Sequence, residues 1–115
     1  MKQETLQTLA ESLWLEYCEI FPVLVKFDCP KIVLNNRLSV TAGRCFSWDN
    51  KIDLGTKFFI KHSTEMLSVI LPHELAHQID CNLNGAYNAD HHRQSWKTIM
   101  VKIGLPPLLY HTMQL

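Results

Sequence analysis

Apolar residues recur along the chain with two different periods, and the first period predicts an N-terminal helix. Between residues 6 and 20 they return every three or four positions, which places them on one helical face: Leu6, Leu9, Leu13, Tyr17 and Ile20. Pro22 is expected to end this element, because a proline interrupts helical hydrogen bonding.

A small sheet is predicted next, where the period changes. Short extended runs cover residues 31–34, 44–48 and 51–54. Turn-forming residues bound these runs, and Asp49-Asn50 separates the last two. The arrangement indicates one strand followed by a hairpin, and we expect the three strands to form an antiparallel sheet.

Two more helices follow the sheet. The second begins near Ser63, a favourable helix cap, and stops at Asn84-Gly85. Its apolar residues are spaced by four: Leu67, Leu71, Leu75 and Ile79. Pro72 interrupts this pattern, so a kink is expected one residue before His73. The third helix ends at Gly104 and has an inward stripe: His92, Trp96, Ile99, Met100 and Ile103.

Length and composition favour one α+β domain over residues 1–115. Hydrophobic residues make up 47% of the 115 positions, which is enough for a packed core. No stretch approaches the roughly 20 consecutive apolar residues of a membrane-spanning helix, and the N-terminus lacks an export signal. Four scattered cysteines without a C-x-x-C pair are typical of free thiols in a reducing compartment. We expect a monomeric, cytoplasmic protein without membrane contact.

The overall charge gives no indication of nucleic-acid binding. Lysine and arginine total 11 residues, as do aspartate and glutamate, and the pI is near 7.0. Sequence-independent attachment to phosphate backbones needs an excess of positive charge. Any contact with nucleic acid would therefore have to be local.

The strongest chemical signal is the run His73-Glu74-Leu75-Ala76-His77. Histidines four positions apart on a helix project from one face and can bind a single ion, and zinc suits imidazole nitrogens. A catalytic zinc site keeps three protein ligands and an open position for water, whose pKa falls toward ~7. The pattern predicts Zn²⁺ bound by His73 and His77, with Glu74 as the base that activates water.

The third zinc ligand is expected on the third helix. Either His91 or His92 could supply it. His92 is favoured, because it precedes Trp96 by one helical turn and shares its inward stripe, whereas His91 would point to the side.

With these motifs in place, residues 5–112 resemble the SprT-like zinc metalloproteases, a family that includes the Spartan protease acting on DNA-crosslinked proteins. The family's zinc helix reads as an apolar run, a proline and then H-E-L-A-H, matched at residues 69–77. Its Thr-Ala-Gly before the hairpin recurs as Thr41-Ala42-Gly43, and its aromatic at the end of the first hairpin strand recurs as Trp48.

The resemblance also bears on the third ligand. The family motif H-G-x-E-W, or the same motif ending in phenylalanine, aligns its zinc histidine with His92 and its aromatic with Trp96. Arg93 and Ser95 replace the family's glycine and glutamate. Longer members continue into a cysteine-rich zinc ribbon, and the resemblance is to a minimal form without it.

The resemblance implies a zincin-like minimal metalloprotease domain that hydrolyses peptide bonds in protein substrates. DNA-associated or DNA-crosslinked proteins are one implied substrate class, and single-stranded DNA is one implied partner. The alternative is a zinc-stabilised SprT-like binding or adaptor module with little proteolytic turnover. His111, near the C-terminus, is a candidate to support a metal ligand or stabilise an oxyanion, or else is a surface histidine.

Overall fold

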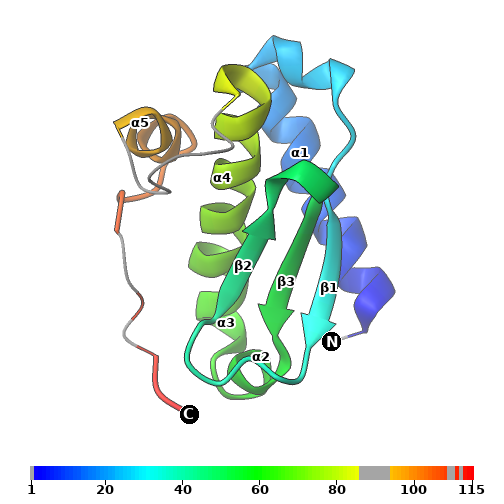
Figure 1. Cartoon of the computed structure of the whole chain (residues 1–115), viewed down its shortest axis with the longest axis vertical. Coiled ribbons are helices and arrows are strands. Elements are labelled where there is room, and N and C mark those ends of the chain that lie inside the picture. The colour runs from blue at the N-terminus through cyan, green and yellow to red at the C-terminus, as the bar shows by residue number, and fades with distance from the viewer. Residues whose placement is uncertain (1, 86–93, 109–110, 112) are drawn as a thin grey trace.

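The chain folds as helices packed on one face of a three-stranded sheet, which confirms the predicted α+β class (Figure 1). This computed structural model describes residues 2–85, 94–108, 111 and 113–115. The main elements are α1 (Gln3–Ile20), β1 (Lys31–Asn35), β2 (Gly43–Phe46), β3 (Lys51–Gly55), α2 (Thr56–Lys61), α3 (Ser63–Glu65), α4 (Leu71–Asn84) and α5 (Gln94–Lys102). Short 3-10 turns cover Pro22–Lys26 and Ser47–Asp49, and a π-helical turn covers Met66–Ile70.

The sheet is mixed, so the expectation of an antiparallel sheet was wrong. β2 and β3 form the predicted antiparallel hairpin, but β1 pairs parallel to β3, giving the order β1-β3-β2. β3 lies at the centre, and four of its five residues, from Ile52 to Gly55, are buried. Alternation along a strand determines which residues face the core, but not which strand becomes its neighbour. This order leaves β2 at an edge.

The buried face of α1 is rotated from the predicted one. The residues in the core are Leu6, Ala10, Trp14 and Tyr17. Leu9 and Ile20, which were predicted to face inward, are exposed. Trp14 explains the rotation, because its large ring is buried and its indole N–H donates to the Phe27 carbonyl at 3.2 Å.

The outer edge of β1 is closed by two glutamines of α1. The Gln7 amide accepts a hydrogen bond from the Ile32 N–H at 2.8 Å and donates one to the Pro30 carbonyl at 3.0 Å. Gln3 bonds in the same way to the Leu34 N–H and the Ile32 carbonyl. These bonds satisfy backbone groups that an edge strand otherwise exposes.

Helical structure is continuous from Ser63 to Asn84, as α3, the π-helical turn and α4 follow one another. The π-helical turn ends two residues before Pro72, whose missing N–H it accommodates. Gly85 ends α4 in the left-handed conformation, with φ of 65°.

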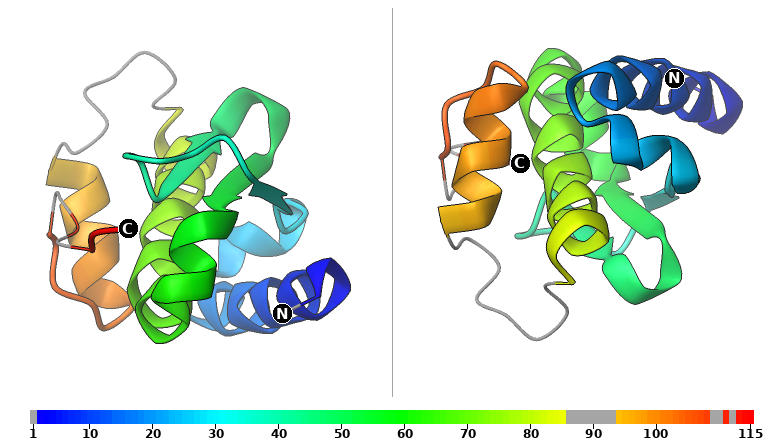
Figure 2. Two further views of the ribbon diagram at one scale, coloured as in Figure 1. Left: turned by 90° about the horizontal axis from the view of Figure 1, so that it is seen from below. Right: turned by 90° about the horizontal axis from the view of Figure 1, so that it is seen from above.

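α5 packs against α4 on the side away from α1, and the C-terminal segment runs back along that side (Figure 2). The buried residues of α5 belong to the stripe predicted for the third helix: Trp96, Ile99 and Met100. In the described part of the chain, no helix has both the length and the apolar character needed to cross a membrane.

Candidate metal centre

α4 brings the imidazoles of His73 and His77 together on one face. Their Nε2 atoms lie 3.3 Å apart, and their ring centroids are 5.0 Å apart. Two nitrogen ligands at about 2.0–2.1 Å from a tetrahedral zinc are themselves about 3.3 Å apart. The separation of the two nitrogens therefore matches that of two ligands on one tetrahedral ion.

Glu74 lies beside this pair but is not placed as a third ligand. One carboxylate oxygen of Glu74 is 3.9 Å from His73 Nε2, and the side chain is buried. Burial raises the pKa of the Glu74 carboxyl from 4.5 to about 8, because the charged form loses its hydration. A cation bound nearby would favour the charged form and lower this pKa.

Gly43 at the start of β2 lets the strand approach α4 closely. A Cβ atom at this position would lie 3.1 Å from Glu74 Cγ and 3.2 Å from Ile70 Cγ2. Both distances are shorter than ordinary contacts, so a larger residue would require the Glu74 and Ile70 side chains or the strand to shift. In the sequence, Gly43 stood out only through the family resemblance, although a glycine within a strand often marks a close approach.

Gln78 connects α4 to the hairpin, a role that the sequence did not reveal. Its buried amide donates to the Ser47 carbonyl at 3.3 Å and to Asn82 Oδ1 at 2.9 Å, while Cys45 Sγ lies 3.6 Å from its oxygen. A polar residue on an apolar helix face was the available signal, because buried amides need hydrogen-bond partners.

Trp96 of α5 positions both imidazoles. Its ring is stacked on His77 with centroids 5.0 Å apart, and it lies 4.7 Å from the His73 ring. Its indole N–H also donates to the His73 carbonyl at 3.4 Å. The first turn of α5 is therefore placed against the two histidines.

The predicted third ligand, His92, and its alternative, His91, lie outside the described residues. Over residues 2–85, 94–108, 111 and 113–115, no group of three metal-ligating side chains comes together. The three-histidine site therefore stays a prediction.

A cleft of about 510 Å³ opens over His73, Glu74 and His77. Its walls come from the loop before β2, the π-helical turn ahead of α4, α5 and the C-terminal segment. Because β2 is an edge strand and its Gly43 lines the cleft, the sheet edge borders the candidate site. An extended peptide could add to such an edge.

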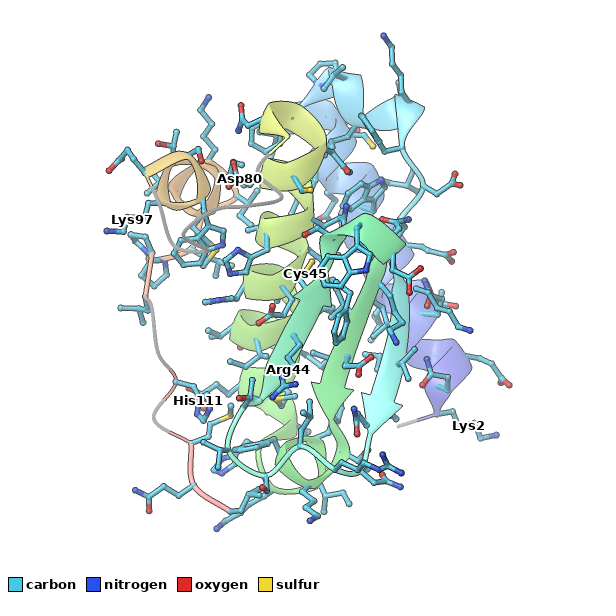
Figure 3. All side chains as sticks on the ribbon, in the orientation of Figure 1. Lys2, Arg44, Cys45, Asp80, Lys97 and His111 are labelled. Carbon is cyan, nitrogen blue, oxygen red and sulfur yellow. The ribbon has the colours of Figure 1, made fainter. Side chains whose placement is uncertain are left out.

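His111 lies on the C-terminal segment and lines the cleft opposite α4 (Figure 3). Its Nε2 is 3.0 Å from the Val40 carbonyl oxygen, so Nε2–H is the donor of this bond. Its buried Nδ1 has no hydrogen-bond partner among the described residues. In the neutral ring Nδ1 carries no proton, so this arrangement favours a tethering role over donation to an oxyanion.

The metal-free protein is expected to lose stability as the pH rises from about 4.5 to about 8, the ordinary and folded pKa values of Glu74. Between these pH values the folded protein holds a proton on Glu74 that the unfolded chain has released. The free energy of unfolding therefore falls as the pH rises, by on the order of a few kcal/mol. Urea denaturation in chelator across these pH values measures it. Glu74→Gln should flatten the dependence, and an unchanged slope in that variant would contradict the assignment.

Comparison with known proteins gives the family. The SprT-like family model matches residues 8–111. Protein SprT of Vibrio atlanticus (strain LGP32) is 28% identical over 91 residues, which cover 78% of this chain and 53% of that relative. The chain thus spans about half the length of this curated relative. No solved structure matches the chain. From the family match, which covers nearly its whole length, the chain belongs to the SprT-like family.

Proposed function

We propose that this chain is a zinc-dependent peptidase in which Glu74 acts as the general base. The observation that carries the proposal is the 3.3 Å separation of the two Nε2 atoms, which fits two ligands of one tetrahedral zinc. The buried Glu74 carboxylate, 3.9 Å from one of these atoms, adds a base beside the metal position rather than on it.

His73, His77 and His92 are the proposed zinc ligands. Support for His92 comes from Trp96, which contacts both imidazoles and follows His92 by four positions, one helical turn in the sequence. When bound, zinc supplies a Lewis acid that makes water easier to deprotonate at neutral pH.

The remaining steps fall to residues of the chain itself. The substrate lies extended against the edge of β2, which Gly43 holds close to α4. Glu74 takes a proton from the attacking water and returns it to the nitrogen of the leaving amine. Glu74 is buried beside the metal position, so it can keep this proton away from bulk water between the two steps.

Protein chains are the proposed substrates. Proteins associated with or crosslinked to DNA are one class within them, and single-stranded DNA is a candidate partner, tested by adding it to the cleavage assay. The relative named SprT is about twice as long as the matched region, so its complete activity is not transferred to this chain.

The proposal is tested by metal content. The folded protein should retain about one zinc per chain after dialysis, and His77→Ala should lose it because two imidazoles cannot hold the ion as three do. Elemental analysis measures the zinc, and circular dichroism checks the fold. The control is His62→Ala, because His62 bonds the Gln114 carbonyl at 2.7 Å outside the cleft. Full zinc occupancy in His77→Ala would contradict the proposed ligand set.

A further inference from the structure

Apart from Thr41 and the residues already assigned, the described residues that line the cleft are apolar. The side chains that contribute to this surface are Val40, Val69, Ile70, Met100, Pro106 and Leu108. Within the described residues, no lysine, arginine or aspartate lines the cleft, and its one carboxylate is Glu74. Among the described residues, a substrate side chain that enters the cleft therefore meets a mainly hydrocarbon surface beside the two histidines of α4 and the proposed base.

Two of these apolar residues line the cleft from different parts of the chain. Val69 lies on the helical side, four positions before His73, and both line the cleft. Leu108 lies on the C-terminal segment and is 56% exposed, while Val40, at the rim, is 80% exposed. This apolar surface remains in contact with water until something covers it.

Described residues beyond Leu108 in the C-terminal segment make several contacts with the rest of the chain. His111 bonds the Val40 carbonyl at 3.0 Å and its ring packs edge-on against Phe58, with centroids 5.2 Å apart. Met113 is buried in the core, and His62 bonds the Gln114 carbonyl at 2.7 Å. These contacts hold described residues beyond Leu108 against the rest of the molecule.

We propose that this surface is a specificity subsite that takes an apolar side chain of the substrate residue adjoining the scissile bond, with Val69 and Leu108 as its specificity-determining residues. This inference rests on the proposed function, because it needs a peptide bond to be held over the metal position. It adds a substrate preference that neither the family nor the motif supplies.

The preference follows from what each kind of side chain would lose. An aliphatic or aromatic side chain leaves water for a hydrocarbon surface, which is favourable in proportion to the area buried. A lysine or aspartate side chain would lose its hydration there. Among the described lining residues no lysine or arginine could receive an aspartate, and Glu74, the one carboxylate, is engaged in the proposed reaction. A single methylene group in a hydrophobic pocket already changes kcat/KM by roughly 10- to 200-fold, so a preference of at least about tenfold for an apolar over a charged side chain is expected.

The experiment is a cleavage-site profile. The zinc-loaded full chain digests a denatured protein mixture, and mass spectrometry identifies the residues on both sides of every cut bond. Quenched peptides that differ only at the preferred position then give kcat/KM for leucine, phenylalanine, glycine, lysine and aspartate. Leucine or phenylalanine at least about tenfold above lysine and aspartate is the expected result.

Leu108→Lys places a positive charge on the exposed wall and is compared with Val101→Lys. Val101 is an apolar residue of α5 that is 62% exposed and does not line the cleft. Leu108→Lys should lower kcat/KM for the leucine peptide by about fivefold or more and raise it for the aspartate peptide, while Val101→Lys keeps the parent profile.

The outcomes separate this inference from the proposed function. The subsite is overturned if the chain cleaves proteins without preference for any residue beside the cut bond, or if Leu108→Lys lowers kcat/KM equally for all peptides. Either result is still compatible with the proposed peptidase activity. Failure of the folded, zinc-loaded chain to cut any protein overturns both.

Discussion

Glu74→Gln is expected to remove nearly all peptide cleavage and to leave zinc binding intact. The amide matches the carboxylate in shape, so it should fit beside Gly43, where Glu74 Cγ already sits close to the strand. It cannot accept a proton from water, and proton transfer by a positioned base contributes about 10²- to 10⁴-fold to rate. The measurement is kcat/KM on a quenched peptide together with zinc content of the same sample.

A matched control for this change is Glu65→Gln. Glu65 ends α3 and does not line the cleft, so its replacement should leave both cleavage and zinc unchanged. Cleavage by Glu74→Gln at the parent rate would show that another group is the base. If parent and variant both bind zinc, unfold on chelation and cleave nothing, the adaptor alternative is favoured.

Trp96→Ala is expected to destabilise the protein by about 3–5 kcal/mol, the range for removing a large buried aromatic side chain. Trp96 is 0% exposed, and its ring contacts both imidazoles of the site. Zinc affinity should fall as well, because the two rings lose the surface that orients them. Urea denaturation in chelator isolates the packing loss from any effect of metal.

Two comparisons make the Trp96 result specific. Trp96→Phe keeps an aromatic ring against the imidazoles and loses the N–H bond to the His73 carbonyl, so it should cost less than Trp96→Ala. Trp48 is 73% exposed, and its ring contacts the Phe46 ring on the hairpin with centroids 5.7 Å apart, so Trp48→Ala should cost less than about 1 kcal/mol. Equal losses at positions 48 and 96 would contradict the role given to Trp96.

The sequence by itself determined the features that depend on neighbouring residues. Histidines at positions 73 and 77 meet because one helical turn separates them, and Gly85 ends α4 because glycine readily adopts a positive φ. The β2–β3 hairpin follows from the turn residues between its strands. Each of these depends on a few consecutive residues, whose local geometry the tertiary fold does not have to supply.

Only the tertiary structure decided which distant segments become neighbours. Nothing local in β1 specifies that it pairs parallel to β3, and nothing local in the chain places the carbonyl of Val40 next to His111. The rotation of α1 toward Trp14 likewise reflects competition among side chains for one core. Such choices depend on the total area buried and on the hydrogen bonds satisfied across the whole molecule, and local spacing records neither.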